Sequence, residues 1–409
     1  MFENSRKSIL NSDNKKWTEL LTATLDLCEK SIRQPNEAVD HVFPYPWLEL
    51  GPGYAYGPAF GHWDIVHATF NLLKDEPGEV MKQLENNFSL MCDDGRLVGA
   101  IFFRANQKYC SDVVTHPPLW VFLADELHKK YGDKDFLRKS LAVLEKQIGW
   151  FERERKTEDG GFYYHDVFAQ RKWECGVDES IRFKDLTPCV KACIDASSHV
   201  FALYDCAYRW SVALSCEKIE HKEKRDKLGE FIIAKMYNEK TGWFYDEFAT
   251  EEQRETIEAI DGAWPLVAGV CNEEIAKRIV ENLTSKELFF TEHPLSMVAP
   301  SSKRFKLQMW QGCSFNSFSF WFAYGMFKNG FFKECKILTE SILEATDKIY
   351  KKTGKIWEFY HPFGGLPQET ARKPQNAQNT PCFDYVGHSP NIAIFNLYEE
   401  CCKKLEMES

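Results

Sequence analysis

Long segments with apolar residues at helical spacing dominate this chain, and they constrain its fold more than any other feature. Residues 15–32, 117–131 and 136–154 each place their apolar side chains on one face of a helix. The second of these segments opens with two prolines, which suit a first helical turn because the missing N–H is not needed there. The same periodicity predicts further helices over residues 190–214, 223–236, 273–282, 314–327, 331–349 and 390–405. Strand-like alternation is limited to short pieces such as residues 97–103 and 160–166.

A short phrase recurs after several of these helices: DDGRLVG at 93, EDGGFYY at 158, EKTGWFY at 239 and KKTGKIW at 351. Its uneven spacing argues against a strict solenoid, but it favours a repeated helical hairpin with a β-turn at one rim, and about six units of roughly 55 to 65 residues would fill the chain. No linker-like stretch separates domains. We therefore predict one all-α domain over residues 1–409, an (α/α)6 toroid whose long loops on one face form a cleft. An irregular helical bundle is the alternative.

Charge, hydropathy and cysteine usage narrow the classes of function. The net charge of −10 leaves no basic surface for nucleic acid. No run of about 18 apolar residues predicts a membrane span, and the N-terminus lacks an apolar signal region. The 14 cysteines are scattered without a CxxC pair, which favours reduced thiols and a cytoplasmic protein. No HExxH or phosphate-binding loop is present, so we predict neither a metal nor a cofactor. The oligomeric state is left open.

Two carboxylates stand out because each lies among aromatic residues beside a glycine turn. Asp178 lies in WECGVDESIRF, which begins at Trp173, and Glu358 lies in KIWEFYHPFGG. Apolar surroundings raise the pKa of a carboxyl group, as a general acid at neutral pH requires. Two carboxyl groups facing one sugar bond are the minimum equipment for glycoside hydrolysis. A helix cap, or a buried ion pair such as Asp178 with Arg182, is the structural alternative.

Three further clusters could accompany these acids. The aromatic share of 14% exceeds what a core alone needs, and flat rings pack well against the apolar face of a sugar. A glycine-rich loop at residues 44–67 offers Tyr54, Trp63 and Asp64. His116 comes just before a predicted helix, and Trp310 and Gln311 come just before another. Packing in the core or capping of a helix would explain each cluster equally well.

Taken in order, these segments resemble the inverting (α/α)6-barrel glycosidases related to glycoside hydrolase family 63. The closer likeness is to its small single-domain members, the mannosylglycerate and glucosylglycerate hydrolases, and trehalases are more distant. The likeness runs over residues 44–390. It rests on five matches, which are Trp63-Asp64 with a "WDS"-type loop, residues 116–118 with "QPP", residues 174–183 with "ESGMDNSPR[WF]", residues 309–312 with "YWRGPxW", and residues 358–364 with "E-x-Y-x-P-x-G".

The resemblance implies roles for individual residues. Asp178 takes the place of the general acid and Glu358 that of the general base. It also implies an inverting reaction with carboxyl groups about 6.5–9.5 Å apart. The residues implied or suggested as substrate contacts are Tyr54, Trp63, Asp64, His116, Trp173, Arg182, Trp310, Gln311, Tyr360 and His388.

Four positions depart from the family pattern. His116 replaces glutamine, Glu179 replaces asparagine, Gln311 replaces arginine, and Phe315 stands where tryptophan is usual. Such positions shape the sugar subsites, so the sugar and the aglycone are not inherited with the resemblance.

The sequence therefore predicts a glycoside hydrolase that removes an α-linked glucosyl or mannosyl unit from a short substrate, a disaccharide or a small polar aglycone such as glycerate. One alternative is a sugar epimerase or isomerase that uses pore-lining histidines; His116, His165, His361 and His388 are the candidates. The other is a sugar-binding protein without catalytic activity.

Overall fold

The computed structural model describes residues 1–35, 42–104, 107–110, 114–168, 173–184, 190–248, 256–375, 377 and 379–408. The α-helices are α1 (Glu3–Asn11), α2 (Thr18–Lys30), α3 (Asp64–Phe70), α4 (Pro77–Phe88), α5 (Trp120–Tyr131), α6 (Lys134–Glu154), α7 (Ile181–Lys184), α8 (Ile194–Ala213), α9 (Ile219–Met236), α10 (Trp264–Ala268), α11 (Glu273–Leu283), α12 (Met309–Gly312), α13 (Asn316–Lys328), α14 (Phe332–Thr353) and α15 (Asn391–Glu408). Short 3-10 helices are η3 (His165–Val167), η4 (Ile260–Ala263) and η5 (Pro367–Glu369).

The strands are short. They are β1 (Ile32–Arg33), β2 (Trp47–Leu48), β3 (Ala59–Gly61), β4 (Ala100–Arg104), β5 (Gln107–Cys110), β6 (Val190–Ala192), β7 (Tyr237–Asn238), β8 (Trp243–Phe244) and β9 (Glu247–Phe248). All of the pairings between them are antiparallel: β1 with β2, β3 with β4, β4 with β5, β6 with β9, and β7 with β8.

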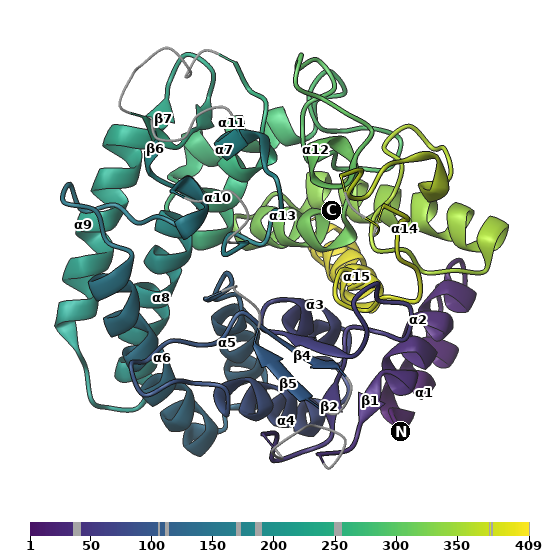
Figure 1. Cartoon of the computed structure of the whole chain (residues 1–409), viewed down its shortest axis with the longest axis horizontal. Helices are drawn as coiled ribbons and strands as arrows, with labels where there is room; N and C mark the ends of the chain where they lie inside the picture. Colours follow the sequence, from purple (N-terminus) through teal and green to yellow (C-terminus); the bar gives the residue numbers. More distant parts are fainter. Residues whose placement is uncertain are drawn as a thin grey trace.

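The helices form a ring of two layers (Figure 1). Among the described residues, α3, α5, α8, α10, α13 and α15 form the inner layer, and each contacts the next in chain order. Outer helices such as α6, α9 and α14 pack against them. The sequence explains the division, because α13 is apolar or buried on nearly every side whereas α11 is strongly amphipathic. The predicted (α/α)6 toroid is confirmed.

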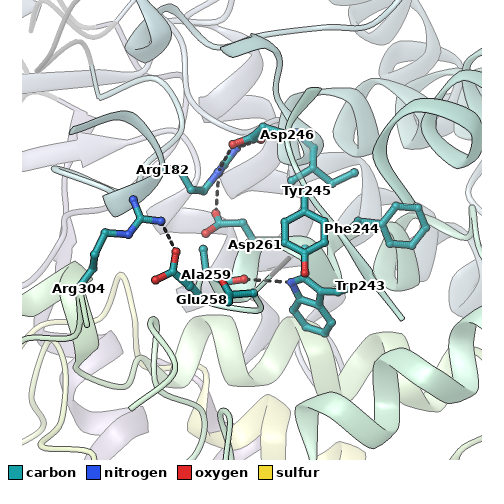
Figure 2. Close-up of a pocket in the computed structure, with 12 residues that line it drawn as sticks. Arg182, Trp243, Phe244, Tyr245, Asp246, Glu258, Ala259, Asp261 and Arg304 are labelled. Atoms are coloured by element: carbon teal, nitrogen blue, oxygen red, sulfur yellow. Dashed lines mark hydrogen bonds and ion pairs between the residues drawn. The ribbon is translucent and has the colours of Figure 1, made fainter. Parts of the chain in front are cut away.

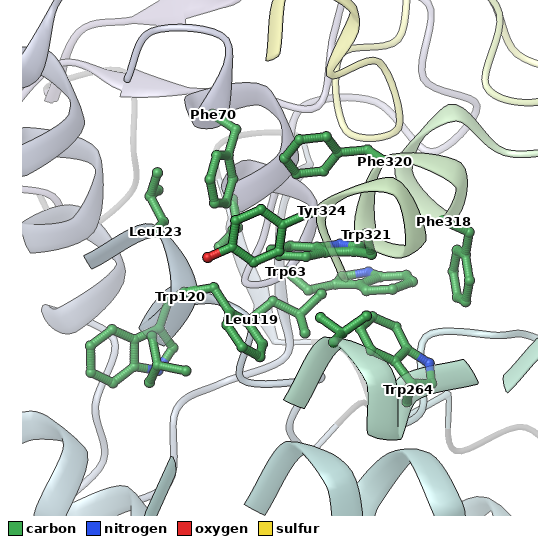
Figure 3. Close-up of a cluster of buried hydrophobic side chains, with 14 of the residues drawn as sticks. Trp63, Phe70, Leu119, Trp120, Leu123, Trp264, Phe318, Phe320, Trp321 and Tyr324 are labelled. Atoms are coloured by element: carbon green, nitrogen blue, oxygen red, sulfur yellow. The ribbon is translucent and has the colours of Figure 1, made fainter. Parts of the chain in front are cut away.

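Aromatic side chains fill the middle of the ring (Figure 3). The ring of Trp321 lies 5.4 Å from that of Phe70 and 6.3 Å from that of Trp264. Its indole N–H donates to Nε2 of His67, and Nδ1 of His67 bonds the carbonyl oxygen of Gly387. Burial lowers the pKa of His67 to about 3, so this histidine is neutral and structural. This packed aromatic cluster is therefore linked, through His67, to the loop that contains Gly387.

The recurrent glycine phrase forms a turn at three of its four positions. Bridges join Met91 to Leu97 and Lys156 to Phe162, and the third turn joins β7 to β8. Gly95 has φ +89°, and a Cβ there would lie 2.4 Å from the carbonyl oxygen of Lys146, so glycine is required. The fourth phrase differs, because Trp357 bridges the distant Phe383 instead.

Two local predictions were wrong. Residues 190–192 were expected at the start of a helix, but they form β6 and pair with residues 247 and 248, so α8 begins at Ile194. Residues 160–166 were expected to be strand-like, but η3 begins at His165 after a single bridge at Phe162. In the described part of the chain, no helix combines the length and the apolar character needed to cross a bilayer.

Candidate active site

The candidate site is a cavity of about 320 Å³ at the end of the ring where several inner helices begin. Asp64 is the first residue of α3, and the loop before α15 supplies His388. The short helix α12, which precedes α13, supplies Trp310. The predicted site residues that line this cavity are Tyr54, Trp63, Asp64, His116, Trp173, Asp178, Trp310, Glu358 and His388. Both candidate catalytic carboxylates therefore face one cavity.

Asp178 stands on a tight loop between η3 and α7. Trp173, Gly176 and Glu179 all adopt positive φ, at 53°, 75° and 60°. A Cβ at Gly176 would lie 2.5 Å from the Trp63 ring, so the loop packs directly on this cavity wall. The Asp178 side chain is 19% exposed, and its carboxylate accepts a 2.6 Å hydrogen bond from Nζ of Lys373.

Glu358 is held more tightly than Asp178. Its two carboxylate oxygens accept hydrogen bonds of 2.7 and 2.9 Å from Nε and Nη2 of Arg372, and both side chains are 2% exposed. Burial opposes the charge on Arg372, but the Glu358 carboxylate outweighs it and raises the pKa of the guanidinium. The paired geometry fixes the direction in which the Glu358 carboxylate faces.

The sequence interpretation missed three polar side chains of the cavity: Arg372, Lys373 and Tyr385. The first two lie in a polar stretch, residues 367–381, that reads as a simple loop. The available signal for these two residues was that two adjacent cations, Arg372 and Lys373, follow the candidate base Glu358 in the sequence. Lys373 lies 5.6 Å from the ring centre of Tyr56 and 5.5 Å from that of Trp173.

Asp64 forms a second acidic centre in the cavity. Tyr385 donates a 2.7 Å hydrogen bond to Oδ1, and Nε2 of His388 lies 3.7 Å from the same oxygen. Burial raises the pKa of Asp64 to about 7. Burial also lowers the pKa of His388 well below its ordinary value, and Nδ1 of its ring bonds Oγ of Ser317. Asp64 can therefore either accept or donate a hydrogen bond to a sugar hydroxyl near neutral pH.

Two departures from the family pattern now have a structural context. Phe315 stacks on Trp310 with ring centres 3.7 Å apart and planes 4° apart, so it supports a cavity wall. Burial lowers the pKa of His116 to about 3, so the cavity has a neutral imidazole where a glutamine was expected.

Three predicted substrate contacts lie elsewhere. Gln311 donates to the carbonyl oxygen of Glu179 and is 2% exposed. Tyr360 stacks on His293 with ring centres 4.2 Å apart; it is buried and does not line the cavity. Arg182 does not line the cavity either.

Arg182 instead lies at the centre of a buried ion cluster (Figure 2). Its guanidinium donates two hydrogen bonds to Asp195, two to Asp246 and one to Asp261, at 2.6–2.9 Å. All five N–H donors of an arginine are used. None is left for a sugar in this arrangement.

Asp195 and Asp246 also belong to a group with Cys193 whose possible metal-ligand atoms lie within 4.8 Å of one another. Both carboxylates accept hydrogen bonds from Arg182, so the charge that faces them comes from the guanidinium. A cavity of about 50 Å³ adjoins the cluster and is lined by Asp246, Asp261 and Arg182.

The ion cluster predicts a pH effect on stability. Burial raises the pKa of Asp261 from 3.8 to about 6. The neighbouring carboxylates of Asp195 and Asp246 contribute to this rise, since they repel a negative charge on Asp261. The folded protein thus favours the protonated form of Asp261. Its contribution to folding stability is fully present below about pH 4 and is lost as the pH rises through 6. We expect D261N to raise the melting temperature more at pH 8 than at pH 5, because only part of this cost is present at pH 5. Thermal melts followed by circular dichroism at both pH values test this, and an equal shift at both would contradict it.

Comparison with known proteins shows what the chain is similar to. The family described as "Mannosylglycerate hydrolase MGH1-like glycoside hydrolase domain" matches residues 212–376. An uncharacterized protein of Borreliella burgdorferi is 22% identical over 302 residues, which cover 72% of this chain. The chain spans only 58% of that relative's length.

Solved structures share the fold over nearly the whole chain. A family 63 mannosylglycerate hydrolase from Thermus thermophilus, in complex with glucose, has a TM-score of 0.69 at 15% identity, covering 93% of this chain and 99% of that one. The neutral trehalase of Saccharomyces cerevisiae has a TM-score of 0.66 at 15% identity, covering 89% of this chain and 76% of that one. Residues 212–376 thus match the family of mannosylglycerate hydrolase-like glycoside hydrolases, and the chain as a whole shares the (α/α)6 fold of these solved structures.

Proposed function

We propose that this protein is an inverting glycoside hydrolase that removes an α-linked glucosyl or mannosyl unit from a short substrate. The observation that carries the proposal is the joint presence of Asp178 and Glu358 in one cavity walled by aromatic rings. The relationship with mannosylglycerate hydrolases and trehalases supports the reaction class.

In the proposed reaction Asp178 is the general acid and Glu358 the general base. Asp178 gives its proton to the glycosidic oxygen as the bond from that oxygen to the anomeric carbon breaks. A water on the opposite face forms the new bond and loses a proton to Glu358. The product from an α-glycoside is therefore the β-anomer of the free sugar. The separation of about 6.5–9.5 Å between the carboxyl groups remains a prediction.

The cavity favours a small substrate. Its volume of about 320 Å³ lies at the lower end of ordinary ligand pockets, so a sugar with a small aglycone is a better match than a long chain. Asp64 with Tyr385 is suited to bind hydroxyl groups of the sugar, since both are polar groups in an otherwise aromatic wall.

Lys373 supports an acidic aglycone such as glycerate. A general acid lies beside the leaving oxygen, so the ammonium next to Asp178 lies on the leaving-group side. A carboxylate on the aglycone would pair with Lys373 in place of Asp178, which leaves the Asp178 carboxyl free to protonate the leaving oxygen.

This gives a test of the aglycone. We expect wild-type protein to favour α-glucosylglycerate over α-glucosylglycerol, two substrates that differ in a carboxylate against a hydroxymethyl group. K373M should lower this ratio of kcat/KM values by about 10- to 100-fold, the worth of a hydrogen bond to a charged group. K355M is the control, because Lys355 pairs with Asp384 outside the cavity. An unchanged ratio in K373M would argue against an acidic aglycone.

A sugar epimerase is the second candidate, because His116 and His388 line the same cavity as the two carboxylates. His165 and His361 do not line it. One assay separates the functions: incubation with α-linked disaccharides and glycosylglycerates, followed by early NMR spectra. A released sugar that first appears as the β-anomer supports inverting hydrolysis. An isomer of unchanged mass supports epimerisation, the α-anomer indicates retention, and binding without turnover indicates a non-catalytic protein.

A further inference from the structure

We propose that Arg182 and Arg155 are positioning residues, which anchor both ends of the loop that carries Asp178 so that its carboxyl group reaches the leaving oxygen. The acid loop is defined here as residues 173–184. The inference rests on the acid role proposed for Asp178 and assigns a task to two arginines that touch no substrate.

The anchor after Asp178 is the Arg182 cluster. Arg182 begins its contacts four residues beyond the acid, and it ties the acid loop to three separate elements. Asp195 lies in the first turn of α8, Asp246 directly precedes β9, and Asp261 lies in η4. A shift of the acid loop would break hydrogen bonds to all three at once.

Arg304 also holds α7, the short helix at the end of the acid loop. Nη1 of Arg304 donates a 2.7 Å hydrogen bond to the carbonyl oxygen of Ile181, and Nη2 donates to the Glu258 carboxylate (Figure 2). The start of α7 is therefore fixed through its backbone as well as through Arg182.

The anchor before Asp178 is a buried pair between Arg155 and Glu174. Nε and Nη2 of Arg155 donate to the two carboxylate oxygens at 3.0 and 2.7 Å. The backbone N–H of His165 donates to the same carboxylate at 2.8 Å. The Glu174 side chain is fully buried, so this acid is fixed four residues before Asp178 and lies outside the cavity.

The backbone beside and between the anchors is strained, which explains the need for them. Trp173 and Glu179 hold left-handed conformations that cost non-glycine residues about 1–3 kcal/mol each. Such conformations persist only where surrounding contacts impose them. Gln311 adds one such contact through the carbonyl oxygen of Glu179.

Stability alone does not account for the Arg182 cluster. Three buried carboxylates face one guanidinium, and well-packed apolar residues are often as stable as a buried ion pair or more so. The planar guanidinium has a fixed hydrogen-bond geometry, so it can instead hold the acid loop in one orientation. A misplacement of 1 Å in a catalytic group can lower a rate by about 100-fold, which is the scale on which such fixation matters.

The test compares leaving groups. R182K keeps the charge but loses the fork, and R209K is a matched control because Arg209 forms a similar two-bond pair with the buried Asp125, outside the cavity. Each variant is assayed on the glycoside hydrolysed by wild-type protein and on the α-glycosyl fluoride of the same sugar. Fluoride departs with little help from a general acid, so this substrate bypasses the task of Asp178.

We expect R182K to lower kcat on the glycoside by about 100-fold with KM nearly unchanged, and to lower it by less than about 10-fold on the fluoride. R155K should show the same pattern. R209K should lower the melting temperature without changing either kcat.

An equal loss on both substrates in R182K, or no loss, would overturn the positioning role. D178N is run beside it and reports on the proposed function separately. A D178N protein without the leaving-group dependence would overturn the acid role and this inference together. Dependence in D178N but not in R182K would overturn only the inference.

Discussion

Replacing Asp178 by asparagine is expected to lower kcat on the natural glycoside by about 10²- to 10⁴-fold, the usual contribution of a general acid. Asparagine has nearly the same shape but cannot give up a proton. The fold should persist, because Asp178 stands at the cavity with its side chain 19% exposed rather than in the core. The measurement is kcat and KM over a pH series, with circular dichroism to check the fold.

E179Q is the matched control for D178N. Glu179 is the adjacent carboxylate, and it does not line the cavity. Among the described residues, its side chain has only a long 3.4 Å hydrogen bond from Gln308. The same chemical change one residue away should leave kcat within about threefold, as expected of a side chain outside the reaction. Near wild-type turnover in D178N would remove the acid assignment, and an equal loss in both variants would point to damage to the acid loop instead.

The fold was predictable from the sequence because its helices are locally encoded. The expected helix over 273–282 corresponds to α11 at Glu273–Leu283, where apolar periodicity and an asparagine cap agree. Residues 190–192 were wrongly placed in a helix because their partner strand begins more than 50 residues later, at Glu247. A local sequence pattern cannot reveal that a segment pairs with a strand far along the chain.

The site was predictable only in part, for the same reason. Asp178 and Glu358 carry a local signal, since each combines a carboxylate with aromatic neighbours and a glycine turn. Arg182 lies in the same motif as Asp178, and the local sequence marks it equally well as a site residue. However, the carboxylates that accept its hydrogen bonds lie 13, 64 and 79 residues away.

The cations of the cavity show the converse case. Arg372 and Lys373 have no local motif, and their importance comes from reaching Glu358 and Asp178 at 14 and 195 residues' distance. A basic residue in a polar stretch has many ordinary explanations. Closure of the ring brings Lys373 onto Asp178, whereas Arg372 reaches Glu358 within the same segment between α14 and α15.

Replacing Glu358 allows a second decisive experiment. The Arg372 guanidinium, which pairs with Glu358, could then hold an added anion that acts as the nucleophile. We expect E358A to lower kcat by about 10²- to 10⁴-fold through loss of the general base. The substitution also removes the carboxylate that faces the buried Arg372, and breaking such a buried ion pair costs about 3–5 kcal/mol of stability. D125A is the matched control, since it removes a similarly buried carboxylate from Arg209 outside the cavity.

Azide separates the chemical loss from the structural one. It is an anion that attacks without giving up a proton, and the space that the Glu358 carboxylate leaves beside the Arg372 guanidinium suits a small anion. In E358A we expect azide to restore turnover and to form the β-glycosyl azide from an α-glycoside, with Asp178 still protonating the leaving oxygen. D178N should gain nothing, because it retains its base and lacks the acid. An α-azide product would contradict inversion, and wild-type turnover in E358A without azide would contradict the base role of Glu358.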